Sequence, residues 1–485
     1  MLLIRADASV QIGTGHVMRM IALAQAWRRR GGEAHLLARS LPPSLAKRLE
    51  TESIGVHHVA AAVAADDIDQ QATINIANQI GARWVVADGY DFSPEFQAAI
   101  RDTSLRLAIV TDFDYCHRWS ADVIINQNPH AMREPYACRV ADCQRLFGTR
   151  FALLRQEFLA SNIASAALQQ PRRPRLLVTL GGSDADNVTG SILSLINQMA
   201  SASIDIRVLV GPANPHLDRL REQAARPSHH VEVLTGVSDM PAQYVWADAA
   251  ITAGGSSCWE WMYFGLPAAI IVIAENQQPI YDELVGQRIA VGLGTPRQID
   301  RDALQRFAQS ISSGGRDFDR FRDWVDGYGA DRCAAAMDSG VWLRQATSAD
   351  CRMYFDWAND PLVRTNSLQS AEISWSEHSE WFREQLGRDD RRLFVAMRSD
   401  RPVGQIRMSL TADSEWQIGF SVDAAARGGG IGTEILRLGI AAMQIDTDPR
   451  FVATVKLANA ASAKCFERLG WQRTRHHETY QFRNA

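Results

Sequence analysis

Short apolar runs alternate with helix-like patterns through the first part of the chain. The apolar runs lie at residues 2–4, 34–38, 84–87, 106–110 and 123–125. Continuous apolar runs separated by helices are typical of parallel strands that are covered on both faces. A polar, proline-containing connector follows at residues 169–174, and the alternation then restarts with a strand at 175–180, a helix at 187–199 and a strand at 249–252. The pattern predicts two parallel α/β domains, at residues 1–165 and 172–337.

The pattern changes after Ser339 and Gly340. A strand at residues 341–344 and helices at 350–358 and 376–386 precede three strands at 392–398, 403–410 and 416–422. Short turns such as residues 400–402 join these strands, and strands joined in this way pair antiparallel. We therefore expect a third domain, of the α+β class, at residues 340–485. The fold class predicted for the whole chain is α/β, with two Rossmann-like domains followed by one α+β domain.

Composition narrows the possible functions. With 485 residues, 46% of them hydrophobic and 22% charged, the chain is typical of a globular protein of about three domains. A net charge of −4 argues against a nucleic-acid partner, since a phosphate backbone selects a basic surface. The apolar runs are too short for a membrane span, the seven cysteines form no CxxC pair, and the histidines show no metal-ligand spacing. We expect a cytoplasmic protein with reduced thiols, no metal and no membrane partner.

A glycine turn follows the first predicted strand and leads into a helix at about residues 17–30. Gly13 and Gly15 lie in the turn, and His16 lies where the helix begins. Unpaired N–H groups and the positive end of the helix dipole favour an anionic ligand there. The imidazole of His16 is suited to accept a proton near neutral pH. Asp7 and Arg19 flank the turn and strengthen the case for a ligand site, although a single GxG also occurs in ordinary packing turns.

Polar segments follow the ends of three other predicted strands, at residues 88–91, 111–114 and 126–128. Each could be a helix cap or a local turn. Ligands bind at the carboxyl ends of the strands in parallel sheets, so several polar ends together predict a pocket. In the second domain, residues 181–184 and 253–260 form two further glycine-serine turns that could bind a diphosphate through backbone N–H groups. Glu260 could reach a ribose diol there or simply complement the helix dipole.

The order of these turns, together with residues 275–277, resembles the GT-B nucleotide-sugar enzymes related to the MurG glycosyltransferase. The segment at residues 5–19, with residues 88–90 and 126–128, is similar to the PseG family, which hydrolyses UDP-2,4-diacetamido-2,4,6-trideoxy-β-L-altropyranose. The resemblance covers about residues 1–335 and implies that His16 is the base for attack of water on the sugar, with Asp7 and Tyr90 as further catalytic residues. The implied UDP-sugar contacts are Gly13, Gly15, Arg19, Asn126, Ser183, Gly254, Gly255, Ser256, Glu260, Asn276 and Gln277.

A glycine-rich loop at residues 427–432 precedes a predicted helix in the third domain. It matches RxxGxG, and its consecutive N–H groups suit a pyrophosphate. With residues 455–462 and 466–471, the loop resembles the GNAT acetyltransferases, and residues 357–364 and 373–378 are similar to the PseH family, which N-acetylates a UDP-4-amino sugar. The resemblance implies acetyl-CoA as co-substrate. The implied contacts are Phe420, Val422, Arg427, Gly428, Gly430, Gly432, Asn459, Ser462 and Phe466.

One departure concerns the acid that protonates the leaving CoA thiolate. Phe466 stands where many GNAT enzymes have a tyrosine, and phenylalanine cannot donate a proton. Water or Tyr480 are the alternatives. Glu415 is a candidate for deprotonating the amine, or else a solvated charge at a strand edge. Tyr354 and Trp357 could contact the sugar or pack in the core.

The sequence thus predicts a bifunctional enzyme of pseudaminic acid biosynthesis that acts on UDP-amino sugars. One alternative for the first two domains is a glycosyltransferase that moves the sugar to an organic acceptor. The alternatives for the third domain are a CoA-binding module without transferase activity and an acetyltransferase that acts on protein amines.

Overall fold

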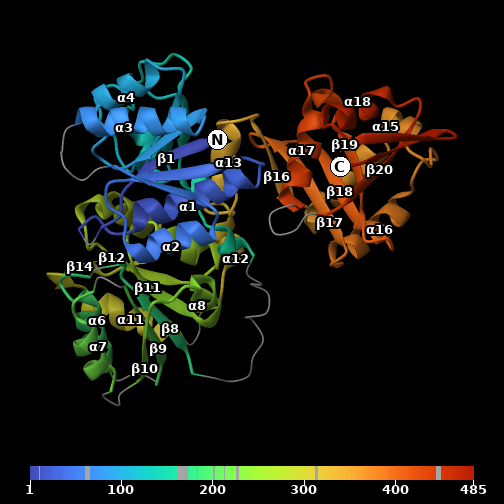
Figure 1. The fold of residues 1–485 in the computed structure, drawn as a ribbon. Helices are drawn as coiled ribbons and strands as arrows, with labels where there is room; N and C mark the ends of the chain where they lie inside the picture. The colour runs from blue at the N-terminus through green and yellow to red at the C-terminus, as the bar shows by residue number, and fades with distance from the viewer. Residues whose placement is uncertain are drawn as a thin grey trace. The chain divides into compact units, whose positions relative to one another are not determined.

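A computed structural model describes residues 1–9, 11–59, 66–160, 173–182, 184–199, 203–211, 214–225, 229–311, 315–443 and 449–484. The chain forms two compact units. Unit 1 consists of Met1–Gln25 and Glu33–Cys333, and unit 2 of Ala26–Gly32 and Ala334–Ala485. Figure 1 shows the chain coloured from the N-terminus to the C-terminus. Ser183, one of the residues predicted to bind the UDP-sugar, lies outside the described residues.

Unit 1 begins with a seven-stranded parallel sheet of Rossmann type, in the order β3-β2-β1-β4-β5-β6-β7. The predicted strands are confirmed as β1, β2, β4, β5 and β6, while β3 and β7 extend the two edges. The strands are β1 (Leu2–Ala6), β2 (Ala34–Ala38), β3 (Gly55–His58), β4 (Trp84–Asp88), β5 (Arg106–Val110), β6 (Val123–Asn126) and β7 (Gln144–Phe147). The helices are α1 (Gly15–Arg28), α2 (Pro43–Thr51), α3 (Asp66–Gln79), α4 (Pro94–Arg101) and α5 (Gln156–Leu159), with short 3₁₀ turns η1 (Pro129–Arg133) and η2 (Thr149–Phe151).

A second parallel sheet follows in unit 1, in the order β10-β9-β8-β11-β12-β13. Its strands are β8 (Arg175–Thr179), β9 (Asp205–Val210), β10 (His230–Thr235), β11 (Ala249–Ala253), β12 (Ala268–Ile271) and β13 (Val291–Gly292), beside a small hairpin of β14 (Gly294–Thr295) and β15 (Gln298–Ile299). The helices are α6 (Val188–Asn197), α7 (Leu217–Ala224), α8 (Met240–Trp246), α9 (Ser257–Tyr263), α10 (Gln278–Gly286), α11 (Arg301–Ser310), α12 (Phe318–Arg322) and α13 (Gly329–Ala336), with the 3₁₀ turn η4 (Glu275–Gln277). The prediction of two Rossmann-like sheets is therefore confirmed.

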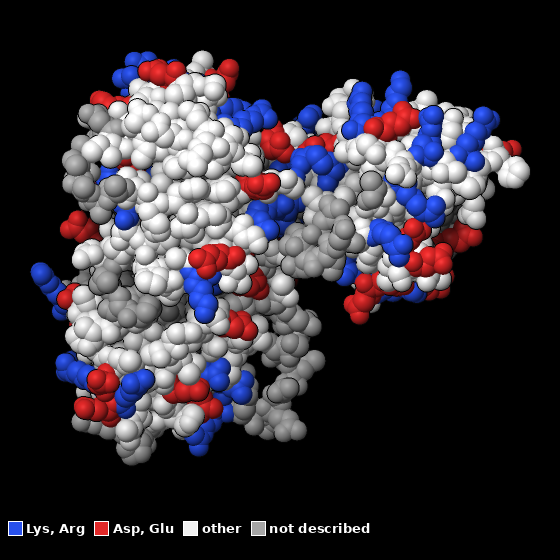
Figure 2. Space-filling view, viewed as in Figure 1, with Lys and Arg blue, Asp and Glu red and all other residues white. Residues whose placement is uncertain are grey.

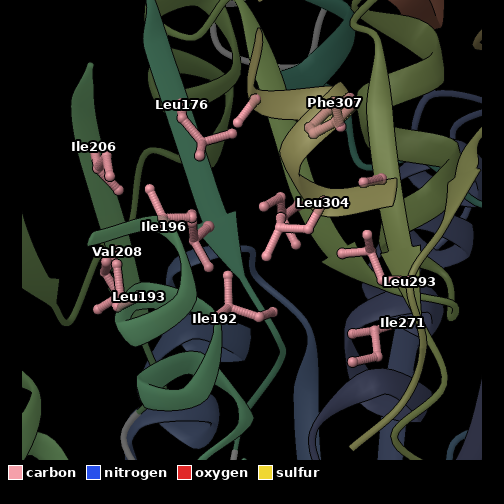
Figure 3. Packing of buried hydrophobic residues seen from close by; sticks show 14 of the residues in the cluster. Leu176, Ile192, Leu193, Ile196, Ile206, Val208, Ile271, Leu293, Leu304 and Phe307 are labelled. Atoms are coloured by element: carbon pink, nitrogen blue, oxygen red, sulfur yellow. The ribbon is translucent and has the colours of Figure 1, made fainter. Parts of the chain in front are cut away.

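The core of the second sheet explains why its strands are almost uniformly apolar. Helices α6 and α11 place leucine, isoleucine and phenylalanine side chains against one face of β8 and β9. Figure 3 shows these side chains, including Ile192 and Leu304, directed toward one another and toward Leu176. Leu176, Ile192 and Leu304 are fully buried. Because the opposite face of the sheet is also covered, by a cluster that includes Leu177 and Ile270, the strands read as continuous apolar runs.

Unit 2 contains a seven-stranded mixed sheet in the order β16-β17-β18-β19-β20-β22-β21. The strands are β16 (Val341–Gln345), β17 (Arg391–Arg398), β18 (Arg401–Leu410), β19 (Trp416–Val422), β20 (Phe451–Lys456), β21 (Gln472–His476) and β22 (Thr479–Arg483). The helices are α14 (Cys351–Ala358), α15 (Pro361–Asn366), α16 (Trp375–Leu386), α17 (Ile431–Met443) and α18 (Ala460–Arg468), with 3₁₀ turns η5 (Ser348–Asp350) and η6 (Ala424–Ala426). The predicted antiparallel meander is confirmed for β17, β18 and β19.

The strands β19 and β20 run parallel but pair only at their beginning. Trp416 pairs with Phe451 and Gln417 with Val452, whereas β19 continues to Val422 and β20 to Lys456. Beyond Gln417 the two strands therefore separate, and the backbone groups of β19 that face β20 are left without a ladder partner. Such unpaired strand edges can accept an extended ligand as an additional strand.

Unit 2 also contains residues 26–32, which are the end of α1 and the four residues after it. The guanidinium of Arg30 donates from Nη1 to the carbonyl of Val341 (2.6 Å) and from Nη2 to the carboxylate of Asp338 (2.7 Å). Arg30 is only 5% exposed. Arg30 therefore fixes the residues after α1 to the start of β16 and the segment before it.

Two surface properties follow from the described residues. None of their helices is both long and apolar enough to cross a bilayer. On the face shown in Figure 2, Lys and Arg are interspersed with Asp and Glu, in keeping with 51 basic and 55 acidic residues in the sequence.

The packing of α11 gives a stability prediction. We expect Leu304→Ala to lower the free energy of unfolding by about 2–5 kcal/mol, because it removes a fully buried side chain and leaves a cavity. Urea unfolding followed by circular dichroism measures this. Gln305→Ala, at an exposed position of the same helix, is the control. Equal stability of the two variants would show that α11 does not hold this core together.

Candidate active sites

The His16 site lies at the carboxyl ends of β1 and β4, which are neighbours in the first sheet. Ser9 and Gly13 exchange two backbone hydrogen bonds and close the loop after β1, and Gly13 has a φ of +76°, which favours glycine. Helix α1 then starts at Gly15, with His16 in its first turn. Asp88 is the last residue of β4 and pairs in register with Ala6 of β1. The order of the strands therefore brings His16 close to Asp88, which is 72 positions away in the sequence.

The imidazole of His16 contacts the carboxylate of Asp88, with 2.7 Å between Nδ1 and Oδ1. A carboxylate can only accept, so Nδ1 carries the proton and donates it to this bond. The lone pair of the neutral ring is then on Nε2, which is the arrangement of a general base oriented by an acid. The side chain of His16 is 13% exposed, whereas that of Asp88 is completely buried. The ring therefore keeps access to solvent while its orientation is fixed from inside.

Arg19 holds two carboxylates at the same strand ends. Its Nε and Nη2 each lie 2.6 Å from the carboxylate oxygens of Asp88, and its Nη1 lies 2.7 Å from Asp112 Oδ1. Burial alone would raise the pKa of Asp88, but Arg19 and His16 bring it below its ordinary value. The same opposition, with Arg19 and Tyr90 as the partners, lowers the pKa of Asp112. Both groups are therefore carboxylates at neutral pH, and Arg19 is engaged in positioning them; direct contact with a UDP-sugar stays a prediction.

Tyr90 links this cluster to the second sheet. Its hydroxyl donates to Asp112 Oδ2 (2.5 Å) and accepts from Asn276 Nδ2 (3.1 Å). Its ring meets the imidazole of His16 edge to face, with 5.1 Å between the ring centroids. Burial and the negative charge of Asp112 raise the pKa of Tyr90, so the phenol stays neutral. The structure thus brings together three predicted site residues, His16, Tyr90 and Asn276, from three separate parts of the sequence.

Two predicted site residues have other partners. The carboxylate of Asp7 accepts from the backbone amides of Arg39 (2.6 Å) and Ser40 (3.1 Å) and pairs with Arg5 (2.7 Å). These contacts hold the loop after β2, and none of those described for Asp7 reaches His16. The catalytic role predicted for Asp7 therefore gains no support, and a loop-stabilising role explains its contacts.

Asn126 is completely buried. Its amide donates to the hydroxyl of Tyr136 (2.6 Å), and its side-chain oxygen accepts from the amide of Asn128 (2.9 Å). Contact of Asn126 with the sugar stays a prediction, and both polar ends of the side chain are used in the turn after β6. This is the local turn role that the sequence had left open for each polar strand end.

The sequence reasoning did not select Asp88, Asp112 or Asn128 individually. Asn128 donates to Asp112 Oδ1 (3.1 Å) and so completes the set of groups around that carboxylate. The signal was present, since all three lie in polar segments that follow buried strands. Strand order in the sheet, which the sequence pattern does not reveal, decided which of these residues meet His16.

The second glycine turn joins β11 to α9. The amide of Gly254 donates to the carbonyl of Ile271 (3.0 Å) and is not available to a ligand. Among the described residues, none accepts from the amides of Gly255 and Ser256, so these two remain candidates for phosphate contact. Gln277 lies beside the turn and accepts from the amide of Ile273 through its side-chain oxygen (3.0 Å).

Glu260 lies in the first turn of α9 and combines the two roles considered for it. The hydroxyl of Tyr244 donates to its Oε2 (3.0 Å), and Arg155 lies 3.5 Å from its Oε1. Burial raises the pKa of Glu260, against the opposing effect of Arg155. A carboxylate held in this way can accept from a ribose diol only through the lone pairs that these neighbours leave free.

The glycine-rich loop of unit 2 turns sharply before α17. Gly428 and Gly430 have φ values of +87° and +80°, which residues with a side chain rarely adopt. An added Cβ at either position would meet no atom within 4 Å, so the space beside the loop is open. Gly432, by contrast, is packed against Phe420 and Val422 of β19 and Cys465 of α18. The loop thus presents its backbone to open space while its base is fixed to the sheet.

Several residues predicted near acetyl-CoA have structural partners. Arg427 donates to the carbonyl of Val422 (3.1 Å) and to Asp360 Oδ1 (2.7 Å), so it fastens the loop to the start of α15. Asn459 is the N-cap of α18 and accepts from the amide of Ser462 (3.1 Å). Direct contact of these residues with acetyl-CoA stays a prediction.

Phe466 is 1% exposed and packs between Trp471 and Phe482, with 5.1 Å between ring centroids in each case. A phenylalanine suits this apolar environment better than a proton donor would. Its predicted contact with acetyl-CoA is unsupported, because the ring belongs to the core beneath α18. Tyr480 packs against Phe482 and faces Arg473, whose guanidinium carbon lies 4.6 Å from its ring centroid.

The remaining candidates of unit 2 are also structural. Glu415 forms an ion pair with Arg483, with a shortest distance of 3.1 Å, at the paired beginning of β19 rather than where β19 and β20 separate. This ion pair favours the alternative of a charge at a strand edge, and a role of Glu415 as a base stays a prediction. Tyr354 is buried and donates to the carbonyl of Phe394 (2.9 Å), and Trp357 donates to Asp423 (2.8 Å). The core interpretation is confirmed for both aromatic residues.

Within the described ranges, no group of three or more His, Cys, Asp or Glu side chains is arranged to hold a metal ion.

Comparison with known proteins agrees with this division of the chain. Residues 341–472 match the model of the acetyltransferase (GNAT) domain, and residues 175–287 match that of the glycosyltransferase family 28 C-terminal domain. The crystal structure of MurG from Acinetobacter baumannii covers 69% of this chain and 97% of its own, with a TM-score of 0.50 and 14% identity. This likeness shows the fold: the two Rossmann-like sheets of unit 1 resemble those of GT-B proteins.

Two relatives extend the comparison. An uncharacterized protein of Methanocaldococcus jannaschii is 21% identical over 482 residues, which are 97% of this chain and 96% of the relative. A UDP-2,4-diacetamido-2,4,6-trideoxy-β-L-altropyranose hydrolase of Campylobacter jejuni is 24% identical over 229 residues, which are 46% of this chain and 73% of the relative. The chain therefore combines a glycosyltransferase-like part, distantly similar to a PseG-type hydrolase, with a GNAT domain, as the sequence motifs predicted.

The lowered pKa of Asp112 gives a pH-dependent prediction. A carboxyl whose pKa is depressed by folding stabilises the folded state above its unfolded pKa of about 3.9, and this stabilisation is lost as pH falls toward the folded value. We expect Asp112→Asn to destabilise the protein by about 1–3 kcal/mol at pH 7, because Arg19 and Tyr90 lose a charged partner. At pH 3 the difference from wild type should shrink. Urea unfolding at both pH values tests this, and a difference that grows in acid would contradict it.

Proposed function

We propose that the chain is a bifunctional enzyme of amino-sugar metabolism. Unit 1 hydrolyses UDP-2,4-diacetamido-2,4,6-trideoxy-β-L-altropyranose to the free sugar and UDP. Unit 2 transfers an acetyl group from acetyl-CoA to the 4-amino group of the UDP-sugar precursor. The observation that carries the hydrolase proposal is the oriented His16–Asp88 pair, with Tyr90 and Asn276 beside it. The named activity of the Campylobacter relative supports the choice of substrate.

In the proposed hydrolysis, a water molecule attacks C1 of the sugar. Nε2 of His16 takes one proton from this water as the new C1–O bond forms. The bond between C1 and the UDP oxygen breaks, and UDP leaves with the electron pair. Asp88, 2.7 Å from Nδ1, stabilises the imidazolium until its proton passes to solvent. Because Arg19 keeps Asp88 ionised, this stabilisation is available throughout the neutral pH range.

Tyr90 and Asn276 suit the placement of that water. The phenol hydroxyl and the Asn276 amide already bond to each other at 3.1 Å beside the ring of His16. The Tyr90 hydroxyl donates its one proton to Asp112 and keeps a lone pair that can accept from a water, while the second N–H of the Asn276 amide can donate, so together they can orient a water molecule in one direction. A neutral phenol is suited to this task, since it binds water without competing with His16 for its proton.

For UDP, the free amides of Gly255 and Ser256 are the proposed diphosphate contacts, and Glu260 is the proposed ribose contact. Backbone amides at the start of a helix stabilise the charge that develops on the leaving diphosphate. The family match over residues 175–287 supports a nucleotide-sugar ligand for this part. No metal is required in this scheme.

Glycosyl transfer to an organic acceptor is the alternative for unit 1, since the matched model over residues 175–287 is that of a glycosyltransferase. Incubation with the UDP-sugar in buffer alone separates the two activities. Release of UDP and free sugar at a catalytic rate supports the hydrolase. Release only after an acceptor is added would establish the glycosyltransferase.

In the proposed acetyl transfer, acetyl-CoA binds with its pyrophosphate on the glycine loop and its pantetheine arm along the unpaired edge of β19. The amine nitrogen attacks the thioester carbonyl, the C–S bond breaks, and CoA leaves as its thiolate, while the amine loses a proton to solvent. Phe466 has no proton to give to the thiolate, so the proposed proton donor is water or Tyr480. Since the acceptor carries UDP, acetylation precedes the hydrolysis in unit 1.

Two alternatives apply to unit 2: a domain that binds CoA without transfer, and transfer to a protein amine. Thiol release from acetyl-CoA in the presence of the UDP-4-amino sugar tests both. The seven cysteines, which are all free thiols, support a reducing compartment such as the cytoplasm for both reactions.

The role of His16 gives the central prediction. We expect His16→Ala to lower the hydrolysis rate at saturating substrate by about 100-fold or more, because the general base is lost. UDP affinity, measured by calorimetry, should change less than threefold, since the proposed UDP contacts are on other elements. His58→Ala, an exposed histidine of the same sheet, is the control. Hydrolysis within tenfold of wild type would show that the base is misassigned.

The glycine loop gives a prediction for unit 2. We expect Gly430→Val to weaken acetyl-CoA binding at least tenfold, because a β-branched side chain disfavours the φ of +80° and occupies the open space beside the loop. UDP-sugar hydrolysis should be unaffected. Gly81→Val, which imposes the same strain at a φ of +65° in unit 1, is the matched control. If Gly81→Val weakens acetyl-CoA binding equally, the loop is not the site.

A further inference from the structure

Arg407 lies in the middle of β18, one strand away from the separation of β19 and β20. It pairs in register with Leu393 of β17 on one side and with Gly419 of β19 on the other. Its neighbours Ile406 and Met408 point to the opposite face, where they pack against Gly439 of α17. Arg407 therefore lies on the face that carries α14 and α16, and its partner Gly419 belongs to the part of β19 that has left β20.

The side chain of Arg407 lies against Gly419 of β19 and over the ring of Trp381. A Cβ added at Gly419 would lie 2.9 Å from Nε and 3.4 Å from Cγ of Arg407, so the absence of a side chain at Gly419 lets the arginine lie across β19. The guanidinium carbon is 5.6 Å from the ring centroid of Trp381 on α16. A guanidinium stacked on an aromatic ring keeps its N–H donors free in the plane of the group.

Charge around Arg407 is uncompensated. Other arginines of unit 2 pair with a carboxylate, for example Arg344 with Asp350 at 2.6 Å and Arg483 with Glu415 at 3.1 Å. In the part of the chain that the structure describes, no carboxylate lies within 4.0 Å of Arg407, and part of its surface is accessible to solvent although the surrounding protein desolvates its guanidinium.

The ionisable groups that act on Arg407 are Tyr354 and Arg364, and Arg407 in turn acts on His378. Desolvation by this surrounding protein lowers the pKa of Arg407, although a guanidinium stays charged at neutral pH. Arg364 adds positive charge near Arg407. Its own N–H groups donate to backbone carbonyls, such as those of Ala358 (2.5 Å) and Ala371 (3.1 Å).

We propose that Arg407, lying across Gly419 and stacked on Trp381, forms a phosphate-binding subsite for the acetyl acceptor of unit 2. The subsite selects amines that carry a phosphate or diphosphate and disfavours cationic acceptors such as polyamines, which the unpaired positive charge repels. An arginine fork matches the paired oxygens of a phosphate group. The inference rests on the proposed acetyltransferase function and deepens it, since it assigns the recognition of the UDP part of the acceptor to named residues.

The test uses the full chain and a panel of amines. The acceptors are the UDP-4-amino sugar, the same amino sugar without UDP, an amino sugar 1-phosphate and spermidine, each assayed by thiol release from acetyl-CoA. We expect Arg407→Ala to raise KM for the UDP-linked acceptor about tenfold or more, and to leave KM for acetyl-CoA and for the unphosphorylated amino sugar within twofold. Arg407→Lys, which keeps the charge but not the fork, should recover part of the loss.

Arg401→Ala removes an exposed arginine from the start of the same strand and serves as the matched control. A purely structural role for Arg407 would affect all acceptors alike, whereas phosphate binding also makes KM for the UDP-linked acceptor rise with salt in wild type and less so in Arg407→Ala. Loss of the same size for every acceptor, or an unchanged KM for the UDP-linked one, would overturn the subsite.

The outcomes also separate this inference from the proposed function. If the chain acetylates the amino sugar 1-phosphate in an Arg407-dependent way but not the UDP-4-amino sugar, the subsite stands and the proposed substrate is wrong. If the UDP-4-amino sugar is acetylated equally well by wild type and Arg407→Ala, the function stands and the subsite is wrong. Transfer only to spermidine or to the unphosphorylated sugar would overturn both.

Discussion

The buried carboxylate of Asp88 is the group on which the His16 site depends. It lies at the end of a central strand with no solvent contact, and it is stable there because Arg19 binds it through two hydrogen bonds of 2.6 Å while His16 takes a third. An isolated charge at this depth would cost several kcal/mol or would be neutralised by a proton. The ion pair keeps the charge, and the charge fixes which nitrogen of His16 is free to act as a base.

In both units the proposed ligand site lies at a glycine-containing turn between a strand and a helix. A strand ends, a glycine-containing turn follows, and a helix begins with its N–H groups directed at the turn. In unit 1 the turn after β1 places His16 beside the polar ends of neighbouring strands. In unit 2 the turn after β19 leads from the strand that separates from β20 into α17. The sheet supplies rigidity, and the turn supplies backbone close to a ligand.

The local pattern predicted most of the framework and several members of the sites. Apolar runs located the central strands because strands buried on both faces carry little else, and the loop at residues 427–432 was found because few other structures need so many glycines. The pattern did not reveal that the side chains of Asp7 and Asn126 stabilise the loops after β2 and β6. It also could not single out Arg407, which looks like any other strand arginine until the lack of a carboxylate neighbour is seen.

The sequence by itself determined the elements, their order and the residue types at each strand end, because these depend on neighbours a few positions away. The tertiary structure decided which strand ends meet: His16 with Asp88, Tyr90 with Asn276, and Arg407 with Gly419. These pairs are 72, 186 and 12 positions apart, and their contact depends on strand order, register and side-chain direction. The pKa shifts of Asp88 and Asp112 follow from the same contacts, since a carboxylate is stabilised by charges that surround it in space and not by those beside it in the chain.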